Sequence, residues 1–296
     1  MADTTSPKTN PASSPKSGTS SPKAASPPGA PLKHGRTYHA YKAGQYLLPN
    51  DDVSTVRGEV ERNTDHLLAK EKPIKRVFEA GCGTGIWAID FADGYPEASV
   101  VGIDLSPVQP EFVPPNLEFF VDDLESDWTF VQPFDFIYCR LLTGSILDWP
   151  KRFGQTFTHL HPGGYIELFD TLNPLVSDDG TLTEDSGLSK WNRLLVEASE
   201  KLGRPLNSYT SYTKQLADAG FVNIVDTRFK WPMNTWPKDA QDKNGVQAVS
   251  LMLFTNVLGW TADQAEVLLV DVRKDAKNRA IHRYWPIHAV YAQKPE

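Results

Sequence analysis

The sequence predicts an α/β protein with a doubly wound, mostly parallel sheet. Five short apolar runs alternate with segments of helical character, the pattern of parallel strands joined by crossover helices. A glycine-rich turn directly follows the first run, and 296 residues suffice for one large α/β domain with appendages. The predicted strands are Val77–Ala80, Val100–Asp104, Leu117–Val121, Phe134–Tyr138 and Tyr165–Phe169.

The C-terminal part adds two strands and a helical cap. Residues 220–229 and 287–293 have the composition of strands, which brings the predicted sheet to seven strands. Residues 239–277 between them predict two helices. We therefore expect a domain over residues 73–296, with cap insertions near 173–215 and 230–285.

The N-terminal residues differ from the rest of the chain. Residues 1–33 consist mainly of Ser, Thr, Pro, Ala, Gly and Lys, so they cannot bury enough apolar surface to offset the entropy of ordering. This predicts a disordered tail. Its three Ser-Pro-Lys repeats fit either proline-directed phosphorylation or a solubilising linker. Residues 34–72 then form an aromatic-rich segment and a predicted helix over 53–70, interpreted as an N-terminal cap.

Charge and composition exclude several classes of protein. The tail carries four lysines and one aspartate, a net charge of +3, which leaves −10 for the rest of a chain whose total is −7. An acidic body argues against direct nucleic-acid binding by the folded domain. Two cysteines in predicted core segments, no signal peptide and no apolar run of membrane-spanning length favour a cytoplasmic or nuclear protein.

The turn after the first predicted strand indicates an adenosine-binding site. Gly81, Gly83 and Gly85 let the backbone turn sharply and leave room for a ligand, and the next helix begins there with free N–H groups. Asp104 ends the second strand, where an acid can accept hydrogen bonds from ribose hydroxyls. Residues 83–88 also fit the dinucleotide pattern G-x-G-x-x-G/A, so a nicotinamide enzyme is an alternative. Glu79 favours a ligand with an ammonium group, because its carboxylate would repel a phosphate.

The carboxyl ends of the other strands supply further candidates, since ligands of open α/β sheets bind at that edge. Asp123 follows the third strand, where an adenine amine would need an acceptor, and Asp122 competes with it for that place. Arg140 follows the fourth strand, and Asp170 follows the fifth as a weak candidate for a catalytic base. His159 and His161 precede the fifth strand, so we expect them at the opposite edge.

These motifs resemble the class I S-adenosylmethionine-dependent methyltransferases, which have a Rossmann-like sheet. The E-x-G-x-G-x-G stretch at 79–85, Asp104, Asp123 and the Pro162–Gly164 turn match in order and spacing. A closer resemblance is to the fungal LaeA-like methyltransferases. It covers about residues 35–296 and is carried by residues 35–41, 83–92, 104–110, 114–118 and 201–205.

The resemblance implies S-adenosylmethionine as the cofactor and an antiparallel pair of strands closing the sheet. It implies that the ribose binds Asp104, that the adenine binds Asp123 and the Leu124 backbone, and that Glu79 and Arg140 lie near the methionine end. Tyr46 would contact the cofactor from the N-terminal cap. A regulator of fungal secondary metabolism and development, working with velvet proteins or a second methyltransferase, is the implied role.

Alternatives to the regulator are a tailoring enzyme for a small natural product and a binding scaffold with little catalysis. The cap aromatics Trp191, Tyr209, Tyr212, Trp231 and Trp236 fit core packing, a partner interface or a substrate pocket. No His, Cys, Asp or Glu cluster has metal-ligand spacing, so no metal is expected. Methyl transfer needs little base catalysis, because the sulfonium is already activated and the protein mainly positions the reactants.

Overall fold

The computed structural model describes residues 32–33, 36–37, 74–171, 173–232 and 250–296. The first two of these ranges are the short strands β1 (Leu32–Lys33) and β2 (Arg36–Thr37), which pair in an antiparallel arrangement. The rest of the predicted tail, the predicted helix over 53–70, Tyr46 and Trp236 lie outside the described residues.

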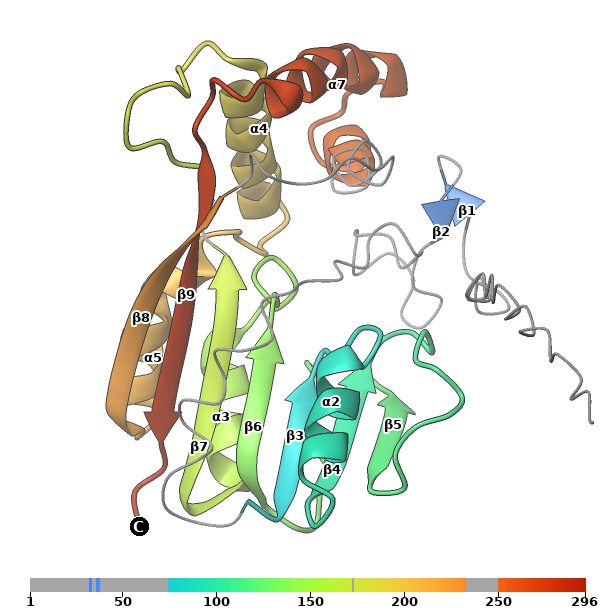
Figure 1. The fold of residues 1–296 in the computed structure, drawn as a ribbon, viewed down its shortest axis with the longest axis vertical. Coiled ribbons are helices and arrows are strands. Elements are labelled where there is room, and N and C mark those ends of the chain that lie inside the picture. Colours follow the sequence, from blue (N-terminus) through green and yellow to red (C-terminus); the bar gives the residue numbers. More distant parts are fainter. Residues whose placement is uncertain (1–31, 34–35, 38–73, 172, 233–249) are drawn as a thin grey trace, which may run out of the picture.

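A seven-stranded sheet forms the centre of the molecule (Figure 1). The strand order is β5-β4-β3-β6-β7-β9-β8, with β3 to β7 parallel and β9 antiparallel to both β7 and β8. The predicted doubly wound, mostly parallel sheet with an antiparallel closing pair is confirmed. Its strands are β3 (Arg76–Ala80), β4 (Ser99–Asp104), β5 (Leu117–Val121), β6 (Phe134–Arg140), β7 (Leu160–Thr171), β8 (Val222–Pro232) and β9 (Tyr284–Gln293).

Helices cover both faces of this sheet, which is why its central strands are apolar on both sides. Helix α2 (Ile86–Gly94) lies on one face, where Val77 and Phe136 pack with Trp87. Helices α3 (Trp149–His159) and α5 (Tyr212–Asp218) lie on the other face, together with the short η1 (Ser208–Ser211). Asp148 caps α3 by accepting a hydrogen bond from the Lys151 N–H, which fixes the start of that helix.

Several boundaries differ from the sequence prediction: β6 ends at Arg140 and β9 begins at Tyr284, and three further differences concern the predicted turn and cap. Strand β7 begins at Leu160, so the predicted turn at 162–164 lies inside the strand. Strand β8 continues to Pro232, into the predicted second cap insertion. Helix α5 packs against the sheet with Tyr212 fully buried, so the end of the predicted insertion near 173–215 belongs to the sheet layer and not to the cap. These three differences depend on packing between segments that are far apart in the sequence, and the local composition of a segment does not predict such packing.

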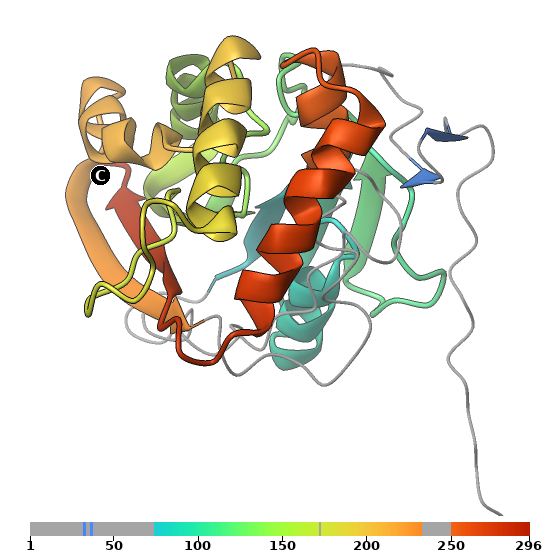
Figure 2. The ribbon, with the colours of Figure 1, turned by 90° about the horizontal axis from the view of Figure 1, so that it is seen from above.

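The cap lies beyond the carboxyl ends of the parallel strands (Figures 1 and 2). It consists of α4 (Gly187–Lys201), helical residues 250–256 and α7 (Ala262–Lys277), which share an apolar core. Trp191 is in that core, and its indole N–H donates to Ser250 Oγ at 2.7 Å. Core packing therefore accounts for Trp191 in the cap and for Tyr212 on the sheet.

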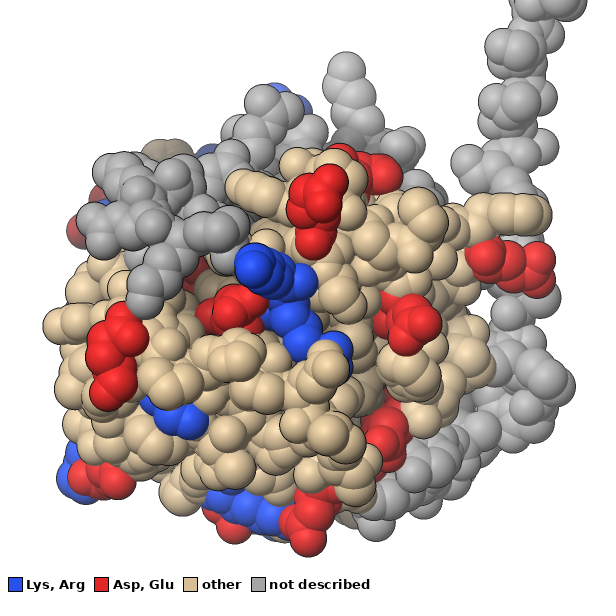
Figure 3. Space-filling view, turned by 90° about the horizontal axis from the view of Figure 1, so that it is seen from below, with Lys and Arg blue, Asp and Glu red and all other residues tan. Residues whose placement is uncertain are grey.

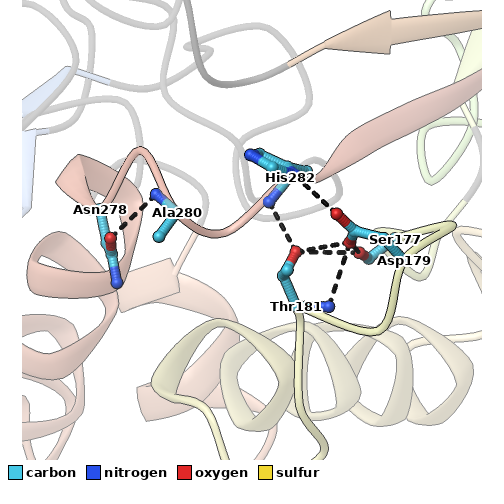
Figure 4. Close-up of polar contacts among 6 residues, drawn as sticks. All are labelled: Ser177, Asp179, Thr181, Asn278, Ala280 and His282. Atoms are coloured by element: carbon cyan, nitrogen blue, oxygen red, sulfur yellow. Dashed lines mark hydrogen bonds and ion pairs between the residues drawn. The ribbon is translucent and has the colours of Figure 1, made fainter.

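A cluster of polar contacts joins two of the segments that connect the sheet with the cap (Figure 4). The Asp179 carboxylate accepts hydrogen bonds from Ser177 Oγ, from the Thr181 N–H and hydroxyl, and contacts His282 Nδ1 at 2.6 Å. These donors hold the pKa of Asp179 below its usual range. The cluster fixes the loop after β7 against the segment that enters β9.

The surface at the amino ends of the parallel strands carries both signs of charge. Lys and Arg side chains are interspersed with Asp and Glu on the described part of this face (Figure 3). Within the described residues, no helix is both long enough and apolar enough to cross a membrane.

Candidate cofactor-binding site

The strand order brings the predicted site residues to one edge of the sheet. Strands β5, β4, β3 and β6 are neighbours, so their carboxyl ends place Asp123, Asp104, Gly81 and Arg140 in a row. The parallel connections explain this placement, because each strand ends at the same edge. His161 lies at the start of β7, at the opposite edge, as predicted.

Asp104 holds the glycine-rich turn in place. Its Oδ2 accepts a hydrogen bond from the Gly83 N–H at 2.8 Å, and its Oδ1 accepts one from the Ser106 N–H at 3.1 Å. Burial raises the pKa of Asp104, and these backbone donors oppose that rise. A carboxylate has about four acceptor positions, so both oxygens retain capacity for ribose hydroxyls.

Gln109 is a second anchor of this turn, and sequence reasoning did not identify it as a site residue. Its Nε2 donates to the Gly83 carbonyl oxygen at 2.5 Å and to the Ser106 carbonyl oxygen at 3.1 Å. It therefore ties the glycine turn to the loop after β4. Its inclusion in the 104–110 stretch of the resemblance was the available signal.

Glu79 is buried and caps helix α2 from a distance. Gly85, the N-cap residue, has no side chain, and the Glu79 Oε2 accepts the hydrogen bond from the Ala88 N–H at 3.1 Å instead. Burial raises the pKa of Glu79 to about 8, against the opposing influence of Arg140. The carboxyl group therefore stabilises the start of the helix that follows the glycine-rich turn.

Phe119 of β5 supports the turn from below. A Cβ at Gly85 would overlap the Phe119 ring, and one at Gly102 would lie 2.5 Å from it. Among the described residues, no atom lies within 4 Å of a Cβ built at Gly83. The ring therefore fills the space under the turn, while the described residues leave the Cβ position of Gly83 unoccupied.

Asp123 and Leu124 form the end of the row next to β5. Asp123 Oδ1 accepts a hydrogen bond from the Glu125 N–H at 2.9 Å. The side chains of Asp123 and Leu124 are buried. Asp122 Oδ1 accepts instead from the Asp123 N–H at 2.7 Å. Of the two acids, Asp123 is the one that lies buried in the turn.

Comparison with known proteins identifies the family. Residues 53–225 match the methyltransferase domain family. Over 283 residues the chain is 42% identical to methyltransferase pytC of Aspergillus terreus, covering 89% of this chain and 87% of that protein. It is 35% identical to the secondary metabolism regulator LAE1 of Cochliobolus heterostrophus, covering 90% and 95%. The chain belongs to the LaeA-like methyltransferases.

A solved structure agrees on the fold of this methyltransferase. The YcgJ protein of Bacillus subtilis superposes with a TM-score of 0.51 at 19% identity, covering 77% of this chain and 95% of that one. The cofactor of the methyltransferase is S-adenosylmethionine, as the resemblance implied. The nicotinamide alternative is therefore set aside.

At the end of β7, the methyltransferase has a buried network around Asp170. Asp170 is 1% exposed, with Oδ1 accepting from the Thr143 N–H at 3.0 Å and Oδ2 from the Tyr212 hydroxyl at 2.9 Å. Burial raises the pKa of Asp170 to about 7. Ser208 Oγ lies 3.1 Å from Thr143 Oγ1 and extends the network.

Other titratable groups of the methyltransferase are placed away from this row. His288 is buried in β9, where Nδ1 contacts Asp226 Oδ1 at 2.8 Å. His159 Nδ1 bonds to the Gln155 carbonyl oxygen at 2.9 Å in α3. Among the described residues, no three His, Cys, Asp or Glu side chains come together as a possible metal site.

Proposed function

We propose that S-adenosylmethionine lies along the carboxyl edge of the sheet, across the glycine-rich turn. Asp104 accepts hydrogen bonds from the ribose hydroxyls, and Asp123 and the Leu124 N–H meet the adenine. Glu79 and Arg140 face the methionine end, and Tyr46 contributes from the N-terminal cap. The observation that carries this proposal is the turn itself, held by Asp104 and Gln109 with open space beside Gly83.

When bound, S-adenosylmethionine supplies a methyl group already activated on a sulfonium. The chain then has to orient the acceptor beneath the cap and exclude water. Both Asp170 oxygens accept hydrogen bonds within the protein, which favours a role in fixing the loop after β6 over one as a base. We propose that the acceptor is methylated mainly through positioning.

A binding experiment tests the cofactor site. We expect S-adenosylhomocysteine to bind with a micromolar Kd, roughly −8 kcal/mol, and NAD to bind far more weakly. Asp104→Ala should weaken binding by about 1.5–3 kcal/mol, because a charged acceptor is lost. Asp90→Asn, at an exposed position on α2, is the matched control and should leave binding unchanged. A folded Asp104→Ala protein with the wild-type Kd would remove Asp104 from the site.

For the biological role we propose a nuclear or cytoplasmic regulator that acts with protein partners of the velvet type or with a second methyltransferase. The relative named a secondary metabolism regulator supports this proposal. The cap supports it as well, because Val267 and Val270 of α7 are 70% and 62% exposed and offer apolar surface to a partner.

The second candidate is a tailoring enzyme, favoured by the 42% identity to a relative named simply a methyltransferase. Transfer of labelled methyl groups to separated protein and metabolite fractions distinguishes the two. Label in protein fractions that increases with a copurified partner supports the regulator. Turnover of a small metabolite by the isolated protein, at a kcat/KM of about 10⁴ M⁻¹s⁻¹ or more, supports the tailoring enzyme.

A further inference from the structure

Arg204 joins three segments that are far apart in the sequence. It follows α4, and its Nη2 forms an ion pair with Glu125 Oε2 at 2.6 Å, in the loop after β5. Its Nη1 donates to the carbonyl oxygen of Ser145, in the loop after β6. The Arg204 side chain is 10% exposed and that of Glu125 is 24% exposed, so solvent screens the pair little.

Glu125 also forms hydrogen bonds with residues on either side of the ion pair. Its Oε1 accepts a hydrogen bond from the Leu147 N–H at 2.6 Å, and its carbonyl oxygen accepts one from Lys151 Nζ at 3.1 Å. Its own N–H donates to Asp123 Oδ1 at 2.9 Å. This hydrogen bond links the position of Glu125 to that of Asp123, and Arg204 holds the Glu125 side chain through the ion pair.

The base of the cap is fixed to the same point. The Arg204 N–H donates to the Ser199 carbonyl oxygen at 3.0 Å, at the last turn of α4. Beside the ion pair is a cavity bordered by Leu124, Leu147 and Leu202. Apolar contacts also link these segments, since Cβ atoms built at Gly144 and Gly203 would lie 2.6 Å from Leu206 and 3.2 Å from Leu147, and the charged contacts add to that packing.

We propose that Arg204 is a positioning residue that couples the cap to the adenine end of the cofactor site. It keeps Glu125, and through it Asp123 and Leu124, in the place required to bind adenine. Cofactor binding then stabilises the base of α4 and thereby holds the cap in the position in which it binds the acceptor. This inference rests on the proposed placement of the adenine at Asp123 and Leu124.

The first test compares variants of the full chain by titration with S-adenosylhomocysteine. Arg204→Met should raise the Kd about tenfold or more, and Glu125→Gln should raise it less, because a charge-assisted hydrogen bond is weakened or lost. The double variant should be no worse than Arg204→Met alone, since both changes remove one interaction. Lys201→Met breaks the exposed Lys201–Glu197 pair at the same end of α4 and should leave the Kd unchanged.

The second test separates positioning from general stability. In the wild type, S-adenosylhomocysteine should slow amide hydrogen exchange in residues 195–203, and in Arg204→Met this protection should disappear while protection around Gly83 remains. The exchanged pair Arg204→Glu with Glu125→Arg should recover part of the affinity. If Arg204→Met does not fold, Glu125→Gln decides the matter by the same two measurements.

The outcomes distinguish the inference from the function on which it rests. A wild type that fails to bind S-adenosylhomocysteine contradicts the proposed site itself. Wild-type binding with an unchanged Kd in folded Arg204→Met, or additive effects in the double variant, overturns the coupling role of Arg204.

Discussion

Alanine substitutions around Phe119 can separate the cost of backbone strain from the cost of steric overlap, because two glycines of the glycine-rich turn and one of β4 differ in these two respects. Gly83 has a φ of +55° and open space around its Cβ position. Gly102 has no positive φ, but its Cβ would lie 2.5 Å from the Phe119 ring. Gly85 combines a φ of +74° with overlap of the same ring. Alanine therefore introduces backbone strain alone at Gly83, overlap with the ring alone at Gly102, and both at Gly85.

The expected losses follow from these geometries. A left-handed conformation costs a residue with a Cβ about 1–2 kcal/mol, and alanine returns about 0.4–1 kcal/mol by restricting the unfolded chain. Gly83→Ala should thus lower the free energy of unfolding by about 0–1.6 kcal/mol. Overpacking costs about 1–3 kcal/mol, so with the same gain from alanine Gly102→Ala should lose about 0–2.6 kcal/mol and Gly85→Ala about 1–4.6 kcal/mol.

Urea unfolding followed by tryptophan fluorescence measures these differences, provided that the slope with denaturant stays constant. Phe119→Leu makes room beneath the turn, so Gly85→Ala should lose less in that background than in the wild type. Gly83→Ala, which does not approach the ring, should lose the same in both. Equal losses for Gly83→Ala and Gly85→Ala, with no effect of Phe119→Leu, would refute the account of the ring as the support of the turn.

Three further predictions concern the core, the cap and the tail. Burial raises the pKa of Glu167 to about 8, and its buried Oε2 has no hydrogen-bond partner among the described residues. The folded state therefore holds a proton that the unfolded state loses above about pH 4.5, and stability falls as the pH rises from there to about 8, by at most about 1.4 kcal/mol per unit. Glu167→Gln should flatten this decline in urea titrations at pH 5 to 8, and parallel curves would contradict it. Ser250→Ala should lower the free energy of unfolding by about 1–3 kcal/mol by removing the acceptor of the buried Trp191 N–H, whereas Ser177→Ala on the exposed loop should have a smaller effect. Deleting residues 1–33 should shift the Tm by less than about 5 °C, because their composition offers no core; a larger drop in calorimetry would show that they pack on the body.

The sheet could be predicted because its information is local. The strands from β3 to β7 are short apolar runs, and helices α2 and α3 follow β3 and β6 as predicted. The connections after β4 and β5 contain no helix, so the predicted alternation of strands and helices is wrong there, although the strands are still parallel with their carboxyl ends at one edge. That rule placed Asp104 and Asp123 in one row and His161 at the other edge, as the structure has them.

What the sequence did not reveal depends on residues far apart in the chain. Glu125 and Arg204 are 79 positions apart, and Asp170 and Tyr212 are 42 apart, so no local pattern links them. Phe119 looks like any apolar strand residue, and its role depends on two glycines from other elements. Gln109 has no motif of its own beyond the stretch that carries the resemblance.

The same distinction explains why the cofactor is easier to infer than the acceptor. The proposed cofactor site is built from turns that each follow a single strand, and their residues appear in order along the chain. The proposed acceptor side combines the loop after β6, the end of β7, η1 and α5, joined by the Asp170 network. Because Asp170 is 1% exposed and both its oxygens accept hydrogen bonds, this network shapes the floor beneath the cap without offering a free base. We propose that specificity for the acceptor depends on the position of the cap, so a change in the contacts at the base of α4 should weaken cofactor binding and methyl transfer together.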